Sequence, residues 1–427
     1  MRHPFVGSQL KFVFCLFLLL PRIQANADPA TAKEGVLDVH ALDLSSNRVA
    51  LAGGWIFWDN QLVSPEHVFN QENPRFVQFP LPWNKVRASR SGIGFGTYGL
   101  KVVTAQEAKS LALEIPQIYS SYTLWVNGQV VAQNGRVGTR AAETIPQWMP
   151  QTVSFTNPGD TIRIVLQIAN FHHDTGGSKD PIYLAASDLL QLQRSTSVTA
   201  NLIESCVLTL IAVGFLLTYF MGERKAVILF FALLCLTWAL RVGFSNLYIF
   251  ISFMPDFNWN AMMRIEYITL FLTMIWAILF LSRVFPKEES RIVKSLLVGV
   301  NVLFTAYALL TTPLAFTKWL PVYLSTSAAL LLFGVYVVLR AWVNQRIGSS
   351  HVAVSIFLAL LVFGYDVFAF KGYFDYNPLL FSVCYIIIFS LMSVVLLLHL
   401  NILKGKEKSQ SILTYQDLYK NNDLTVK

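Results

Sequence analysis

Aromatic and histidine side chains recur through the first half of this 427-residue chain, and their types suit the binding of a carbohydrate. A sugar presents flat C–H faces that stack on aromatic rings, and hydroxyl groups that need hydrogen-bonding partners. The candidate ligand-binding residues are Trp83, Tyr119, Tyr122, Trp148, His172 and His173. Trp148 is the best placed of them, because it lies in a Pro-rich loop and loops carry binding residues more often than strands do.

The same residue types also build protein cores. Trp55 and Trp125 lie in strand-like segments, where a tryptophan is more often a core residue than a ligand platform. His172-His173-Asp174 could suggest a metal site, but adjacent side chains on a strand point to opposite faces and make poor joint ligands. The sequence contains neither of the catalytic motifs G-x-S-x-G and H-E-x-x-H, and no pair of carboxylates within a recognisable catalytic motif. We therefore expect no catalytic residue, no metal, no cofactor and no enzymatic activity.

A second set of chemically capable residues consists of ionisable side chains inside apolar segments, where each is costly unless it is paired or hydrated. The set is Glu204, Arg241, Arg264, Glu266 and Asp366. We interpret it as an intramembrane polar network near the outer mouth of a helix bundle. Arg264 and Glu266 are two residues apart, so they point to different faces of their helix. The alternative is that these side chains only extend to the lipid headgroups.

The elements that hold this network are seven apolar segments between residues 198 and 400. The spans are approximately 198–220, 226–249, 261–281, 295–314, 321–340, 352–370 and 379–400. A helix of about 20 residues crosses a hydrocarbon core of ~30 Å. Because 54% of the residues are hydrophobic and only 14% are charged, a disordered or nucleic-acid-binding chain is excluded. The sequence predicts a membrane protein with a seven-helix bundle.

The loop charges predict the orientation of the bundle. The expected inner loops carry Arg224, Lys225, Arg283, Lys287, Arg291, Lys294, Arg340 and Arg346, and the tail adds Lys404, Lys406 and Lys408. The expected outer loops carry only Lys318 and Lys371. Lysine and arginine concentrate on the cytoplasmic side of membrane proteins. We therefore expect the C-terminus in the cytoplasm and the N-terminal half outside.

The N-terminus resembles an export signal. Arg2 and Lys11 precede the apolar run 12–20, and Ala25-Asn26-Ala27 follows it as a cleavage site. We expect a signal peptide over residues 1–27, with an uncleaved anchor as the alternative.

Residues 28–194 are predicted to form an exported β-domain. This part carries 13 Lys or Arg and 14 Asp or Glu, so it is nearly neutral. Residues 161–168 alternate apolar and polar side chains as a half-buried strand does. Asn127-Gly128 between alternating apolar residues predicts a hairpin. About ten short strands indicate a sandwich or jelly roll. All four cysteines lie in hydrophobic segments, so no disulfide is expected here.

Several short sequence motifs in this half resemble those of a galactose-binding-like jelly roll. They are residues 53–58, Pro82-Trp83-Asn84, residues 96–100, 119–128 and 170–173. With seven helices behind it, the chain resembles the bacterial seven-transmembrane receptors with diverse intracellular signalling modules. The resemblance implies an exported jelly roll that binds carbohydrate or another small ligand, and helices that relay the signal inward across the bacterial cytoplasmic membrane. The fold also resembles the accessory sugar-binding domain of some glycosidases, which is not their catalytic domain.

Residues 401–427 are expected to form a short basic cytoplasmic tail that contacts anionic lipid. Such a tail cannot fold a kinase or cyclase by itself. This departs from the family, and leaves open a separate cytoplasmic signalling partner or a curtailed copy.

The leading prediction is therefore a membrane receptor for a carbohydrate-like or other small ligand. Two other classes are a transporter or polymer-export component with a sugar-binding domain, and a multi-pass enzyme. A transporter is expected to show interrupted helices and polar residues at the membrane midplane. Membrane lipid is an expected partner and nucleic acid is not, while a homodimer is compatible with the sequence.

Overall fold

The computed structural model describes residues 30–105, 110–157, 159–370 and 377–424, leaving out the side chains of residues 363, 366–370 and 402–424. The expected signal peptide, residues 1–27, lies outside this description. The chain forms an all-β part over residues 36–186, followed by a helical part. This arrangement confirms the predicted fold class of a β-domain in front of a membrane bundle.

Two facing sheets and a small third sheet make up the β-domain. The elements are β1 (Val36–Asp38), β2 (Val49–Ala50), β3 (Gly53–Asp59), β4 (Arg75–Phe79), β5 (Leu81–Pro82), α2 (Trp83–Val86), β6 (Gly94–Val103), β7 (Ser110–Ile115), β8 (Ile118–Tyr119), β9 (Ser121–Val126), β10 (Gln129–Asn134), β11 (Gln151–Thr156), β12 (Thr161–Asn170), β13 (Gly177–Ser178) and β14 (Tyr183–Ala186). The large sheet has the order β10-β9-β12-β6-β3-β4, with β1 parallel to β6. The second sheet has the order β11-β7-β14-β2, and the third β5-β13-β8.

The alternation of β12 places its two faces in different environments. Ile162, Ile164 and Leu166 are buried in the main core between the sheets. Val165 points to the opposite face, where it packs with Val68 and the half-buried Trp125 in a smaller cluster. Trp55 is fully buried in the main core, as predicted. Both faces of this part of the large sheet are therefore covered by apolar side chains.

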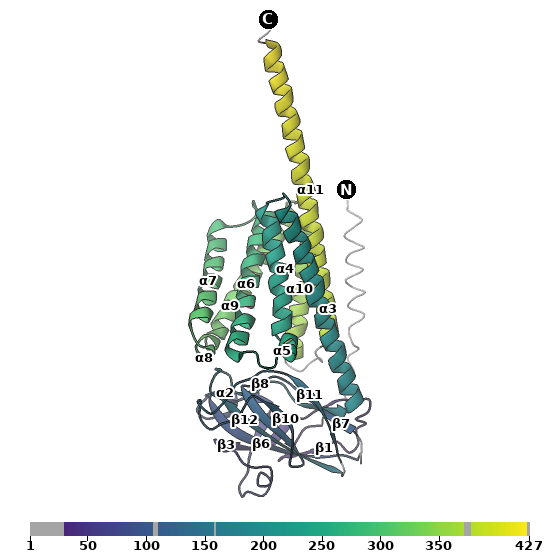
Figure 1. The fold of residues 1–427 in the computed structure, drawn as a ribbon, viewed down its shortest axis with the longest axis vertical. Coiled ribbons are helices and arrows are strands. Elements are labelled where there is room, and N and C mark those ends of the chain that lie inside the picture. The colour runs from purple at the N-terminus through teal and green to yellow at the C-terminus, as the bar shows by residue number, and fades with distance from the viewer. Residues whose placement is uncertain (1–29, 106–109, 158, 371–376, 425–427) are drawn as a thin grey trace.

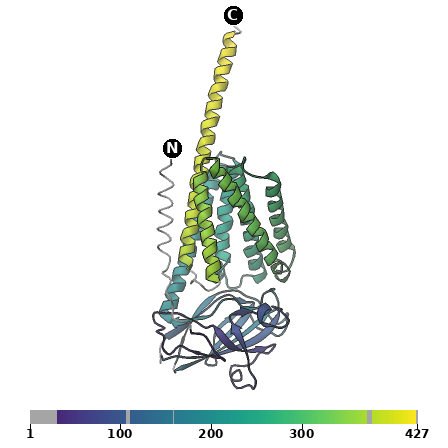
Figure 2. The same cartoon turned by 180° about the vertical axis from the view of Figure 1, so that it is seen from behind.

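The helical part stands on the β-domain, as Figures 1 and 2 show. Its elements are α3 (Ser187–Phe220), α4 (Ala226–Phe244), α5 (Ile249–Phe253), α6 (Trp259–Val284), α7 (Arg291–Leu310), α8 (Pro313–Thr317), α9 (Leu320–Val343), α10 (Ser349–Phe370) and α11 (Pro378–Leu424). Six described helices are long and apolar enough to cross a membrane, and α10 adds an apolar stretch over Ser349–Val362. They correspond to the seven expected spans.

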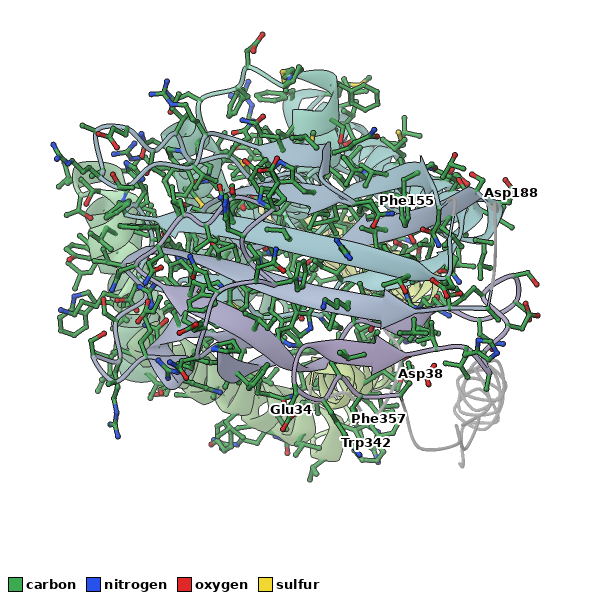
Figure 3. All side chains as sticks on the ribbon, turned by 90° about the horizontal axis from the view of Figure 1, so that it is seen from below. Glu34, Asp38, Phe155, Asp188, Trp342 and Phe357 are labelled. Atoms are coloured by element: carbon green, nitrogen blue, oxygen red, sulfur yellow. The ribbon has the colours of Figure 1, made fainter. Side chains whose placement is uncertain are left out.

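Two of these helices extend beyond the expected spans. β14 ends at Ala186 and α3 begins at Ser187, so the helix starts before residue 194. α11 runs on as one helix to Leu424, through most of the expected tail, and projects past the end of the bundle that lies away from the β-domain (Figure 1). Figure 3, viewed from the β-domain end, shows the large sheet lying across the helices, with Asp188 of α3 at the edge of the domain.

The turn between β9 and β10 confirms the predicted hairpin and provides a test of the fold. Asn127 and Gly128 have φ values of 49° and 83°. A left-handed conformation costs a non-glycine residue about 1–2 kcal/mol. We therefore expect Gly128→Ala to lower the free energy of unfolding of the β-domain by about 1 kcal/mol.

Gly159→Ala is the matched control, since Gly159 has no positive φ and, like Gly128, no heavy atom within 4 Å of an added Cβ. The measurement is limited proteolysis of the full chain in detergent at increasing urea concentrations. The urea concentration at which half of the β-domain is cleaved gives the midpoint of unfolding. Equal midpoints for the two variants would contradict the turn geometry.

Candidate functional site

The β-domain and the helices meet through an aromatic cluster, which we call the aromatic junction. It contains Tyr119, Trp148, His172 and His173 from the β-domain, and Tyr248 and Trp259 from the helical part. Four of the six predicted ligand-binding residues therefore come together at one place. Trp148, which lies in the Pro-rich loop, is fully buried because residues of the helical part pack against it.

The rings of the junction pack closely across the boundary. Tyr119 stacks on His173 with a centroid distance of 4.7 Å, and Trp148 lies 5.2 Å from both rings. Trp148 also packs edge-on against Trp259 at 5.7 Å and Tyr248 at 6.0 Å. His172 lies 6.2 Å from Trp259. Trp148 thus touches both parts of the protein, since aromatic pairs interact at such separations.

The loop that carries the two histidines is fixed by Asn170 at the end of β12. The buried amide of Asn170 donates to the carbonyls of Gly92 (2.8 Å), His173 (2.7 Å) and Thr175 (3.0 Å), and its Oδ1 accepts from the backbone N–H of His173 (3.2 Å). A Cβ on Gly92 would lie 2.1 Å from the carbonyl oxygen of Asp174, so only glycine permits this approach. The junction is consequently presented by a rigid loop.

His173 is neutral at pH 7 because it is buried. Burial lowers the pKa of His173 to about 4, and a hydrogen bond with the Thr175 carbonyl opposes this shift in part. Burial also lowers the pKa of His172. Burial and the nearby carboxylate of Glu266 both raise the pKa of Tyr119. All three side chains are therefore held in their uncharged forms.

Direct hydrogen bonds also cross from the β-domain to the helical part. Gln147 Nε2 donates to the carbonyl of Pro255 (2.9 Å) in the segment between α5 and α6. The backbone N–H of Asp174 donates to Thr317 Oγ1 (3.2 Å) in α8. On the other side of the domain, the hydroxyls of Ser154 and Ser187 are 2.6 Å apart at the start of α3. The two parts are joined at more than one point.

The junction also contains buried nitrogen atoms that have no hydrogen-bond partner among the described protein groups. They are Trp148 Nε1, Trp259 Nε1, His172 Nδ1 and His173 Nε2. Indole nitrogens only donate, so the two tryptophans supply hydrogen-bond donors for an oxygen atom. The junction thus combines aromatic rings with a few polar atoms, which are residue types that also line small-ligand sites.

Trp83 and Tyr122, the other two predicted ligand residues, lie in the core of the sandwich. The indole N–H of Trp83 donates to Tyr98 Oη (2.8 Å), and the guanidinium of Arg87 lies 3.8 Å from the ring centroid of Trp83. Both side chains are fully buried because they follow the inward face of the domain. Neither side chain belongs to the aromatic junction, because both lie in the core between the sheets.

Part of the expected intramembrane network reaches the junction. Arg241 Nη1 donates to the backbone carbonyl of Glu266 (2.8 Å). The hydroxyl of Tyr248, a junction residue, donates to Glu266 Oε2 (3.1 Å). Arg241 and Glu266 are therefore linked, and Tyr248 connects the Glu266 carboxylate to the aromatic rings.

The other members of the expected network lie apart from this pair. Arg264 donates to the carbonyls of Ala308 (3.3 Å) and Thr311 (3.0 Å) at the end of α7. Glu204 Oε1 accepts from Trp238 Nε1 (3.0 Å). The side chain of Asp366 lies outside the described residues. Instead of one network, the described side chains form three separate groups, because they project from different helix faces.

The sequence singled out neither Tyr248 nor Trp259 as a site residue. Among the described residues, no group of three His, Cys, Asp or Glu side chains is arranged to hold a metal ion.

The low pKa of His173 predicts how the stability of the β-domain depends on pH. The unfolded chain protonates this histidine near 6.5, whereas the folded chain protonates it near 4. The unfolded state thus binds more protons in this interval, and stability should fall as the pH drops from 6.5 towards 4. We expect His173→Gln to flatten this dependence of the melting temperature in detergent. His40→Gln, at an exposed position, is the control and should leave it unchanged.

Comparison with known protein families finds a match for the helical part of the chain. Residues 201–402 match the family model for 7TM diverse intracellular signalling. No curated protein sequence matches the chain.

Similar solved structures include three bacterial glycosidases. They are a Faecalibacterium prausnitzii β-glucuronidase (TM-score 0.26, 15% identity, 33% of this chain and 31% of that one), an Eisenbergiella tayi GH2 β-galacturonidase bound to galacturonate (0.24, 14%, 35% and 26%) and a Ruminococcus gnavus β-glucuronidase (0.25, 15%, 33% and 28%). The chain spans less than a third of the length of each enzyme. The family match therefore covers the helical part of the chain, and the β-domain over residues 36–186 lies outside it.

Proposed function

We propose that this protein is a non-enzymatic membrane receptor, whose β-domain binds a carbohydrate-like or other small ligand outside the cytoplasmic membrane. The aromatic junction passes the resulting change to the helices, and a separate cytoplasmic signalling protein receives it. The observation that carries the proposal is the position of Trp148, which packs on Tyr119 and His173 of the β-domain and on Tyr248 and Trp259 of the helical part.

The route into the bundle follows from the contacts of the junction. A shift of Trp148 acts on Tyr248, whose hydroxyl is bound to the Glu266 carboxylate. Glu266 is linked to Arg241 on the neighbouring helix α4. Packed cores have discrete arrangements and do not deform continuously, so a displaced ring at the junction changes helix packing by a step.

Helix continuity supports a receptor over a transporter. Transporters commonly place substrate at the midplane between interrupted helices. Each of α3, α4, α6, α7 and α9 runs from end to end without interruption.

The proposed orientation of the protein in the membrane is based on the positions of the basic residues. α3 leaves the β-domain and ends at Phe220, at the far end of the bundle (Figure 1). Arg224, Lys225 and Arg346 therefore lie at the end opposite the β-domain, and Arg346 Nε pairs with Glu288 Oε1 at 2.6 Å. An excess of basic residues favours the cytoplasmic side for that end.

Cysteine labelling tests this orientation. In a background without the four natural cysteines, we expect an impermeant maleimide to label Asp256→Cys in intact spheroplasts. Arg291→Cys, at the opposite end of the bundle, should react only after permeabilisation. The reverse pattern would place the β-domain in the cytoplasm and remove the proposal.

A ligand screen on the full chain in detergent tests the binding step. A ligand at 100 times its dissociation constant stabilises the folded state by about 2.7 kcal/mol, so a panel of mono- and oligosaccharides should contain one that raises the melting temperature with concentration. Small acids and short peptides form the second panel. No shift with any member of either panel would contradict the proposed small-ligand receptor.

The relay is tested separately with the ligand found in that screen. We expect the ligand to change amide hydrogen exchange in residues 244–254 of the wild type but not of Trp148→Ala, because the variant lacks the ring that joins the two parts. Trp125→Ala is the matched control, since this tryptophan packs on the other face of the large sheet. A loss of the exchange response in both variants would argue against a specific role of the junction.

A further inference from the structure

Arg241 and Glu266 bring opposite charges together next to the aromatic junction without forming an ion pair with each other. Arg241 lies in the last turn of α4, and Glu266 lies roughly two turns into α6, the helix that begins at the junction residue Trp259. Both residues are half-buried. The hydrogen bond between them joins Arg241 Nη1 to the backbone carbonyl of Glu266 and leaves the carboxylate of that residue unused. Each charge therefore keeps bonding capacity for another group.

The free groups of Arg241 are those that bind a carboxylate best. A guanidinium has five N–H groups, and the Glu266 carbonyl uses one of them, on Nη1. The edge formed by Nε and Nη2 makes no hydrogen bond or ion pair with any residue that the structure describes. This edge presents two parallel N–H groups, which match the two oxygen atoms of a carboxylate. An arginine without an ion-pair partner is costly in a membrane segment, so the position favours an anion.

Glu266 offers the complementary group for a cation. Its Oε2 accepts from the hydroxyl of Tyr248 (3.1 Å), while its Oε1 has no hydrogen-bond partner among the described groups. Lys179 of the β-domain attracts the carboxylate but forms no ion pair with it. Tyr248 and the nearby Tyr119 place aromatic rings beside the carboxylate. An ammonium group binds favourably where a carboxylate and aromatic faces adjoin.

We propose that Arg241 and Glu266 form a binding site for a small zwitterion of the α-amino acid class, at the end of the bundle next to the β-domain. The ligand carboxylate binds the Nε and Nη2 edge of Arg241, and the ligand ammonium group binds Glu266 Oε1. An acid alone leaves Glu266 without a counter-charge, and an amine alone leaves Arg241 without one. The site lies one hydrogen bond from Tyr248, so its occupation acts on the aromatic junction from the helical side. The inference does not depend on a ligand of the β-domain.

Thermal unfolding of the full chain in detergent, with each of the common L-α-amino acids in turn, tests the ligand class. We expect at least one of them to raise the melting temperature with concentration, because a ligand that binds only the folded state stabilises it. The N-acetyl derivative of that amino acid lacks the ammonium group, and its amide lacks the carboxylate, so neither should give a shift. No shift with any amino acid at millimolar concentration, or an equal shift with either derivative, would overturn the proposal.

Substitutions test whether that amino acid binds at these two residues. We expect Arg241→Gln and Glu266→Gln each to weaken its binding about tenfold or more, since each leaves one ligand charge unpaired. Arg264→Gln and Glu204→Gln are the matched controls and should keep the affinity, because Arg264 binds carbonyls at the end of α7 and Glu204 accepts from Trp238.

Arg241→Lys provides a second measurement that remains informative if Arg241→Gln does not fold. Lysine keeps the positive charge but lacks the paired N–H edge, so binding of the amino acid should again be weaker than in the wild type. Unchanged affinity in both Arg241→Lys and Glu266→Gln would place the amino acid elsewhere and overturn the assignment. A sugar bound to the β-domain should stabilise these variants and the wild type equally, which separates this site from the receptor function proposed above.

Discussion

The structure depends on the direct passage from strand to helix at Ala186 and Ser187, where no linker separates β14 from α3. β14 is hydrogen-bonded between β7 and β2, so the first turn of α3 starts from a strand that is fixed on both sides. Leu190 of α3 packs on Ala112 and Ala185 of that sheet. The β-domain consequently cannot swing on a flexible tether. Its freedom is limited to small rotations about the base of α3.

A domain held at one edge needs a second contact to fix its tilt, and the aromatic junction supplies it. The junction lies away from the base of α3, on the part of the bundle formed by α5, α6 and α8. Its rings are large and its buried polar atoms are few, so it resists water without binding the two parts through many directional bonds. Such a contact stabilises one arrangement of the β-domain on the helices. A second arrangement requires only a small number of rings to move.

The polar groups within the bundle are divided between these two attachments. Arg241 and Glu266 lie behind the junction and reach it through Tyr248. Glu204 lies on α3 and accepts a hydrogen bond from Trp238 of α4. Arg264 binds the carbonyl groups at the end of α7 and so stabilises a helix terminus. The described acids and bases of the membrane part therefore act on different helix pairs.

The sequence was sufficient to predict the helices and strands, but not which of them pack against one another. Local signals sufficed for β12, whose alternation is visible, and for the turn at Asn127 and Gly128, whose chemistry is specific. Trp83 and Trp148 could not be told apart, because a pattern shows which residues point inward but not which surface a second domain covers. The partners Trp148 and Tyr248 are distant in the chain, and their contact arises only from the packing of the two parts.

The unbroken course of α11 has a mechanical consequence. A helix of 47 residues is about 70 Å long, and it contains no proline after its first residue at which it would bend. If the end of α11 that begins at Pro378 is held, a tilt of about 5° carries the opposite end through about 6 Å, by simple leverage on that length. A rearrangement of side chains no larger than one hydrogen bond at the held end of α11 is thus magnified, along a single helix, into a displacement comparable with the size of a side chain.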